Sequence, residues 1–124
     1  MCKLSHLALG ASLVTVCASV PAQGNVLDVG KKAYAECTAC HAVEKGSNGV
    51  GPTLFGVVGS RAAEVDGFRF SGPMKRSGIV WTAENLDKYL ADPQTVIPGN
   101  RMPYSGMPDA GMRAALIRYL ETLK

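Results

Sequence analysis

The most regular hydrophobic pattern in the chain lies near its C-terminus, where apolar residues recur three and four positions apart. This spacing places their side chains on one face of a helix. We expect the helix to begin near Pro108, a residue that suits a first helical turn, and to run to the end of the chain. Its predicted buried face consists of Met112, Ala115, Leu116, Tyr119, Leu120 and Leu123.

A second helix is predicted at the start of the folded region. Asn25 can cap its N-terminus, with Asp28 three residues further on. Apolar residues then recur at a spacing that fits one helical face. The residues expected to share this face are Val26, Ala33, Tyr34 and Cys37.

Two adjoining helices are predicted in the second half of the chain. Thr82 stands where an N-cap is expected, ahead of a short amphipathic stretch. Pro93 ends this helix or begins a shorter one, for which Asp92 would be the cap. The apolar residues of the longer helix are Leu86, Tyr89 and Leu90.

The rest of the chain has no strand of normal length, no repeat and no low-complexity linker. Glycine-rich loops occupy residues 46–59. A chain of 124 residues has room for one domain, so we predict an all-α fold of about four to five short helices. Aromatic residues make up only 6% of the chain, which indicates that a bound group fills part of the interior.

The N-terminus has the pattern of a signal peptide. Lys3 is followed by an uncharged, mostly apolar run over residues 7–20, and small residues precede an expected cleavage after Ala22. A retained membrane anchor is the alternative, but the run is short for a bilayer span and Gly10 interrupts it. We therefore expect residues 1–22 to direct export to the periplasm and residues 23–124 to form the mature domain, in which no other segment could cross a membrane.

The motif that carries chemistry is Cys37-Thr38-Ala39-Cys40-His41, the C-x-x-C-H signature of haem attachment. On a helical turn, residues three and four apart share a face, so both thiols and the imidazole can reach one flat ligand. A structural zinc site would need a fourth ligand, and a thioredoxin-like pair would need a strand–helix–strand pattern that is absent. We predict one haem c, bound through Cys37 and Cys40, with His41 as an iron ligand.

The second axial position of the iron would be filled by a methionine in an electron carrier and left open in a ligand-binding protein or an enzyme. Met107 and Met112 fit the last helix, and Met74 fits a loop. Met102 lies in a loop in which apolar residues do not recur at the spacing of an amphipathic element, and Pro103 restricts its backbone to an extended form. Such a loop presents a side chain instead of burying it, so Met102 is our candidate for the second ligand.

Together these residues resemble class I cytochrome c, the family of mitochondrial cytochrome c and its soluble bacterial relatives. The resemblance runs from about Val26 to Lys124, and the haem motif lies near the mature N-terminus, as in that class. It implies the class I fold around one covalently attached haem. Further matching residues are Gly51 to Gly56, Gly67, Phe68, Ile97 to Gly99, and the helix-crossing positions Gly30, Tyr34, Leu116 and Tyr119.

The resemblance also implies roles for three residues around the haem. The carbonyl of Pro52 would accept the proton of the His41 imidazole and orient the ring. Trp81 would bond a haem propionate, and Tyr89 would lie beside the sulfur of Met102. The chain departs from the family pattern at Ser60, Phe70, Met74 and Asn100, where the family has an arginine, a tyrosine, an asparagine and a threonine.

The charged surface also departs from that of mitochondrial cytochrome c, which has a ring of lysines around its exposed haem edge. Lys31, Lys32 and Arg101 retain part of the ring. Without the signal peptide the chain has 12 Lys and Arg against 10 Asp and Glu, a net charge of +2. We therefore expect weak electrostatic steering and an apolar contact around Tyr104, Met107 and Pro108. The ring positions without a basic residue are Glu36, Gln94, Thr95, Pro108 and Asp109.

These observations predict a periplasmic, monomeric one-electron carrier that is not an enzyme and that exchanges electrons with protein redox partners, such as a dehydrogenase or reductase and an oxidase. Two alternatives stay open. One is a haem enzyme or gas binder with an open iron, and the other is a dedicated subunit of one dehydrogenase. The basic pairs of the chain are short and fit a solvated face better than a nucleic-acid site, and we expect at most peripheral membrane contact.

Overall fold

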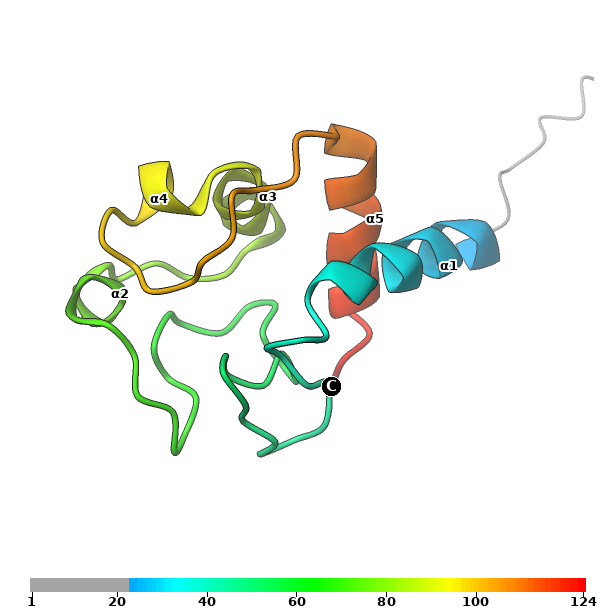
Figure 1. Cartoon of the computed structure of the whole chain (residues 1–124). Helices are drawn as coiled ribbons and strands as arrows, with labels where there is room; N and C mark the ends of the chain where they lie inside the picture. The colour runs from blue at the N-terminus through cyan, green and yellow to red at the C-terminus, as the bar shows by residue number, and fades with distance from the viewer. Residues whose placement is uncertain (1–22) are drawn as a thin grey trace, which may run out of the picture.

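The computed structural model describes residues 23–124, and the predicted signal peptide lies outside them. The described part is helical, and its only extended pairing is an isolated bridge between Arg61 and Val80. The predicted all-α fold is therefore confirmed (Figure 1). No helix within residues 23–124 has the length and apolar character needed to span a bilayer. The elements are α1 Gln23–Ala33, the 3-10 helix η1 Tyr34–Glu36, α2 Gly72–Arg76, α3 Ala83–Ala91, α4 Pro93–Val96 and α5 Ala110–Leu120.

The first and last helices, α1 and α5, cross each other and form one side of the core (Figure 1). A Cβ atom at Gly30 would overlap the carbonyl group of Ala115, so only glycine allows the two backbones to approach this closely. Next to the crossing, the rings of Tyr34 and Tyr119 pack with their centroids 5.6 Å apart. The helix crossing expected from these positions is thus present.

The capping residues predicted for α3 and α4 are both correct. The Thr82 side chain accepts a hydrogen bond from the backbone N–H of Asn85 at 3.1 Å, and Asp92 does the same for Thr95 at 3.1 Å. Each cap satisfies an N–H group that has no partner inside its helix. Of the predicted apolar face of α3, Leu86 and Tyr89 are buried and Leu90 is half-buried.

The predicted start of the first helix is wrong. Asn25 is not a cap but lies inside α1, which already includes Gln23. Val26 also leaves the predicted buried face, because 41% of it is exposed. Val26 borders a shallow surface groove whose other wall is α5, and the small residues Gly111 and Ala114 opposite it leave it partly open to solvent.

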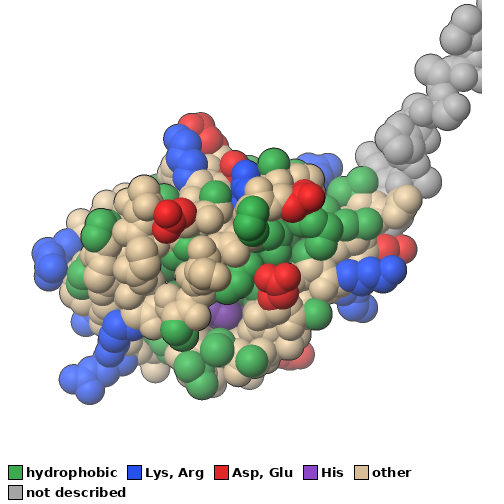
Figure 2. Space-filling model, turned by 45° about the horizontal axis from the view of Figure 1, so that its top comes forward, with side chains coloured by type: hydrophobic (Ala, Val, Ile, Leu, Met, Phe, Trp, Pro, Cys, Tyr) green, Lys and Arg blue, Asp and Glu red, His purple; other side chains and the backbone are tan. Residues whose placement is uncertain are grey.

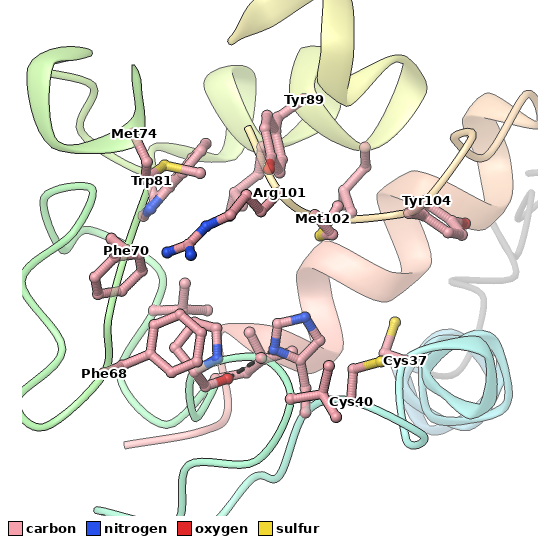
Figure 3. Close-up of a pocket in the computed structure, with 18 of the residues that line it drawn as sticks. Cys37, Cys40, Phe68, Phe70, Met74, Trp81, Tyr89, Arg101, Met102 and Tyr104 are labelled. Atoms are coloured by element: carbon pink, nitrogen blue, oxygen red, sulfur yellow. Dashed lines mark hydrogen bonds between the residues drawn. The ribbon is translucent and has the colours of Figure 1, made fainter. Parts of the chain in front are cut away.

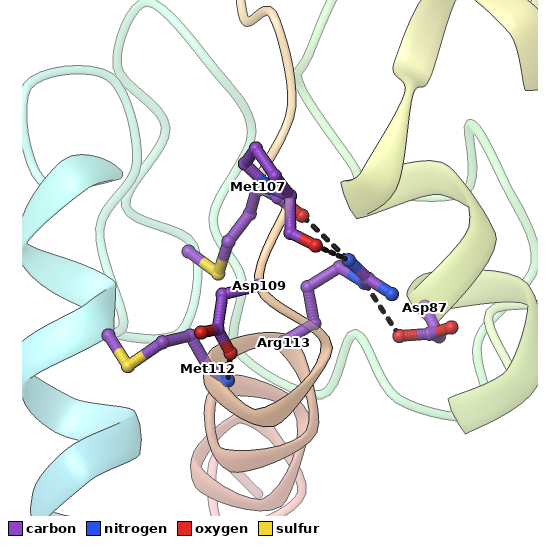
Figure 4. A network of polar contacts seen from close by, with 6 residues as sticks. Asp87, Met107, Asp109, Met112 and Arg113 are labelled. Carbon is purple, nitrogen blue, oxygen red and sulfur yellow. Dashed lines mark hydrogen bonds and ion pairs between the residues drawn. The ribbon is translucent and has the colours of Figure 1, made fainter.

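The last helix begins two residues later than predicted, at Ala110. Asp109 caps it by accepting a hydrogen bond from the N–H of Met112 at 2.8 Å, which leaves Pro108 outside the helix. Met107 is consequently in the preceding loop, but it is buried, with only 5% exposed. Arg113 holds this loop end by donating to the carbonyls of Met107 and Pro108, and it pairs with Asp87 of α3 at 2.8 Å (Figure 4).

The prediction of a loop around Met74 is also wrong. Met74 lies in the short helix α2, for which the Ser71 side chain is the cap and Pro73 stands in the first turn. A serine with a proline two residues later, as in Ser71-Gly72-Pro73, is a signal of a helix N-terminus that the sequence contained. The helix is too short to show a hydrophobic period, so only its cap could have revealed it.

Candidate functional site

A cavity of about 520 Å³ opens between the ligand loop, residues 97–109, and the loops that follow the cysteine motif. Its volume lies within the ~300–1,000 Å³ that is typical of ligand pockets. All seven site residues predicted from the sequence line this one cavity, and most of its other walls are apolar (Figure 3). The seven residues are Cys37, Cys40, His41, Pro52, Trp81, Tyr89 and Met102.

The cysteine motif forms a tight turn at one side of the cavity. The N–H groups of Cys40 and His41 both donate to the carbonyl of Cys37, at 3.1 and 2.9 Å. Cys37 and Cys40 are free thiols, and no disulfide joins them. Burial, together with the neighbouring Glu36 and Cys40, raises the pKa of the Cys37 thiol to about 11. The turn thus presents two thiols and an imidazole to the same space.

The imidazole of His41 is held from several directions. Its Nδ1 lies 2.6 Å from the carbonyl oxygen of Pro52, which can only accept a hydrogen bond, so Nδ1 carries the proton. Nε2 then has a free lone pair, as a metal ligand requires. A Cβ atom at Gly51 would come within 2.5–2.9 Å of three ring atoms, so glycine is needed beside the ring. The hydroxyl of Tyr34 fixes the main chain by donating to the His41 carbonyl at 2.7 Å.

Met102 reaches the cavity from the ligand loop, on the side opposite Cys37 and Cys40 (Figure 3). Within the described chain, Met74 is the one other methionine that lines the cavity. Met107 and Met112 pack into the core around Leu116 instead. The structure therefore reduces the candidates for a second thioether ligand to Met102 and Met74.

Arg101, Phe68 and Tyr104 also line the cavity but were not among the predicted site residues: the sequence placed Arg101 and Tyr104 on the surface around the haem edge and gave Phe68 only as a match to the family. The guanidinium of Arg101 extends into the cavity beside Phe70 and donates to the carbonyl of Arg69 (Figure 3). Phe68 and Phe70 pack edge to face, with ring centroids 4.8 Å apart. The family resemblance was the signal that pointed to the haem for these three residues, whereas their local sequence has no motif that shows their side chains facing a cavity.

The cavity fits the haem that the motif predicts. Two thiols and an unprotonated imidazole nitrogen lie on one side, a thioether on the other, and apolar side chains between them. Arg101 and Trp81 face the cavity and supply a positive charge and hydrogen-bond donors there (Figure 3). These groups suit the acidic groups of a porphyrin. Phe70, in place of a tyrosine, supplies no hydroxyl there.

The face around the site is rich in apolar side chains and also carries acidic ones. In Figure 2, hydrophobic and several acidic side chains lie around the histidine surface, whereas lysines and arginines lie mainly toward the margins. Val50 lines the cavity and is 75% exposed, the largest value among the exposed bulky apolar residues of the described chain. Tyr104 is half-buried and Pro108 exposed, but Met107 points inward, so its predicted place in an apolar contact surface is wrong.

Comparisons with known proteins agree with this geometry. The family model described as Cytochrome c matches residues 27–124. Cytochrome c2 iso-2 of Magnetospirillum molischianum is 53% identical over 88 residues, which span 71% of this chain and 91% of the relative. Cytochrome c2 of Rhodopila globiformis is 49% identical over 88 residues, with 71% and 83% covered.

Solved structures give the same result for the fold. The structure of cytochrome cH from Methylobacterium extorquens aligns with a TM-score of 0.74 at 46% identity, covering 77% of this chain and 97% of that one. Ferricytochrome c2 from Rhodopseudomonas palustris aligns with a TM-score of 0.73 at 33% identity, covering 79% and 98%.

Proposed function

The chain belongs to the class I cytochrome c family and carries one haem c bound through Cys37 and Cys40, and from this premise we propose that it is an exported, freely diffusing carrier of single electrons. Its place would be the periplasm, between respiratory or other periplasmic oxidoreductases. It would act as a monomer and catalyse no reaction on a small substrate. The export signal predicted over residues 1–22 supports the location.

The observation that carries the proposal is the pairing of a prepared imidazole with a thioether across an apolar cavity. His41 would be one axial ligand through Nε2, since Pro52 occupies Nδ1 at 2.6 Å. Met102 would be the other, because its loop presents it to the cavity from the opposite side. His41 and Met102 would thus hold the iron with an imidazole and a thioether, a ligand pair that favours electron transfer over binding of an external substrate.

The haem, when bound, supplies an iron that gains and loses one electron. The protein would supply a dry, rigid surrounding with little reorganisation. Trp81 is suited to hold a propionate, and Tyr89, packed on Trp81 with ring centroids 4.8 Å apart, would stand beside the Met102 sulfur. Arg101 would add a positive charge near the acidic groups of the haem.

The absorption spectrum of the purified, oxidised holoprotein tests the proposal directly. Iron–thioether ligation gives a weak far-red band, which we expect in the wild type and in Met74→Ala but not in Met102→Ala. Met102→Ala should also lower the reduction potential and bind added cyanide or carbon monoxide faster. Absence of the band from the wild type would refute the carrier assignment and favour an open-iron enzyme or gas-binding protein.

The location is tested separately, by fractionating cells that express the full-length chain. We expect haem-stained protein in the periplasmic fraction, with an N-terminus at or near Gln23. Recovery in the membrane fraction at full length would instead indicate a retained anchor. Co-purification with one dehydrogenase at fixed stoichiometry would show a dedicated subunit instead of a free carrier.

A further inference from the structure

The ligand loop contains a buried amide whose hydrogen bonds converge on the backbone next to Met102. Asn100 is one of two buried polar residues in the described core and is only 6% exposed. A buried amide without partners would be costly, because each unmade hydrogen bond leaves its desolvation uncompensated. In this site every polar atom of the Asn100 side chain is used.

The two ends of the amide have different functions. Its oxygen accepts the N–H of Met102 at 2.9 Å. Its nitrogen donates to the carbonyls of Pro93 and Ile97, at 3.0 and 2.9 Å. Both acceptors belong to α4 or its C-terminal end, and Pro93 is almost completely buried. The amide therefore connects the backbone of Met102 to a fixed point of the core.

The main chain around Asn100 strengthens this connection. Its N–H donates to Ile97 at 3.1 Å, and its carbonyl accepts the side chain of Gln94 at 3.1 Å. On the other side of Met102, Pro103 restricts the same backbone to an extended form. No helix or strand includes Met102, but its backbone is fixed on both sides. Its N–H is hydrogen-bonded to Asn100, and Pro103 follows it.

We propose that Asn100 is a positioning residue for the axial thioether: it holds the Met102 backbone so that the sulfur stays over the iron. This inference rests on the proposed role of Met102. The family's threonine at this position has one hydroxyl, which can donate a single hydrogen bond and cannot reproduce the two donations and one acceptance of the amide. Asparagine instead gives the loop its own rigid link to α4.

The test compares Asn100 with a polar residue whose hydrogen bond lies away from the cavity. Thr82 caps α3 by accepting the backbone N–H of Asn85 at 3.1 Å, and it does not line the cavity. Asn100→Leu removes the amide while keeping a side chain of similar size, and Thr82→Ala removes the cap. Both variants should unfold at a lower denaturant concentration than the wild type.

The two variants should differ in the state of the iron. We expect Asn100→Leu holoprotein to bind cyanide at least about tenfold faster than the wild type, a factor equal to about 1.4 kcal/mol, and to lose intensity in the far-red band. Thr82→Ala should keep both properties near those of the wild type. Asn100→Thr, a milder change that is expected to fold, should give an intermediate rate.

Each outcome leads to a definite conclusion. Equal cyanide rates and unchanged far-red bands in Asn100→Leu and Thr82→Ala would overturn the inference and leave Asn100 with a role in stability alone. If Asn100→Leu does not fold, an unchanged rate in Asn100→Thr would overturn it as well. A wild type without the far-red band would refute the proposed ligation by Met102 itself, which is a different result from either of these.

Discussion

The hydroxyl of Tyr104 donates a hydrogen bond to the carboxylate of Glu36 at 2.8 Å, although 68 residues separate them in the chain. Tyr104 belongs to the ligand loop, and Glu36 immediately precedes Cys37 of the haem motif. Both residues line the cavity. The bond therefore joins the two sides of the site directly, from the loop that presents Met102 to the segment that holds the cysteines.

Removing this bond should loosen the ligand loop. Tyr104→Phe keeps the ring but not the hydroxyl, and a hydrogen bond at a half-exposed position contributes about 0.5–1.5 kcal/mol. We expect cyanide to bind the oxidised Tyr104→Phe protein about two- to tenfold faster than the wild type, measured by stopped-flow absorbance. Tyr119→Phe, which alters a tyrosine of α5 away from the loop, is the control and should leave the rate unchanged.

Stability at high pH should depend on Tyr89. Burial raises the pKa of this phenol to about 12, from about 10 in an unfolded chain. A raised pKa means that folding favours the neutral form, so the associated stability is complete below about pH 10 and is lost as pH rises toward 12. Urea unfolding between pH 9 and pH 12 should therefore show a steeper decline for the wild type than for Tyr89→Phe. Parallel declines would contradict the burial of this hydroxyl in the holoprotein.

The chain should not fold without its haem. The two clusters of buried side chains, around Leu116 and around Trp81, both border the 520 Å³ cavity, and a space of this size would otherwise lack packing contacts. We expect a Cys37→Ala, Cys40→Ala chain without haem to lack the near-ultraviolet circular dichroism of a packed core. A near-native spectrum would show that the helices stabilise one another without the cofactor, contrary to the coupling seen in small metal-binding domains.

The cysteine motif, the ligand loop and the caps of α3 and α4 could be predicted because their chemistry is local. Thr82 and Asp92 bond to residues three positions away, and the two cysteines and the histidine occupy one turn. Met107 could not be placed in the same way, because its position depends on contacts with Leu90 of α3 and Arg113 of α5. Asn100 bonds to residues as near as Ile97 and Met102, but no sequence pattern shows that its amide turns inward. Val26 shows the converse case: its helical period is correct, but Gly111 and Ala114 of α5 opposite it are too small to cover it.

The polarity of the site should respond to Met74. This side chain lines the cavity and packs against the cluster around Trp81, at a position where the family has a polar asparagine. An apolar site disfavours the extra positive charge of ferric iron, so Met74→Asn should lower the reduction potential modestly. Spectroelectrochemical titration measures the shift, and a clear rise would mean that Met74 is turned away from the haem or that asparagine disrupts another contact.

Docking of redox partners should depend little on long-range charge. Five positions of the ring lack a basic residue, and all five are exposed, so the charge at each contributes to the electrostatic field at the surface. They are Glu36, Gln94, Thr95, Pro108 and Asp109. The mature net charge of +2 falls to about +1 with a ferric haem and its two propionates, and to about 0 on reduction. Apolar residues at the mouth of the cavity, Val50 above all, should then provide much of the contact.

We therefore expect the second-order rate of electron transfer with the native partner to fall only mildly between low and physiological ionic strength, in laser-flash or stopped-flow measurements. Salt lowers the rate by screening electrostatic attraction, and a nearly neutral protein has little attraction to screen. A Thr95→Lys, Pro108→Lys variant restores two exposed basic positions without touching the contacts of Glu36 or Gln94, and it should acquire a steep salt dependence with a partner that has an acidic docking face. A steep dependence already in the wild type would contradict the apolar interface and indicate that Lys31, Lys32 and Arg101 suffice to guide the encounter.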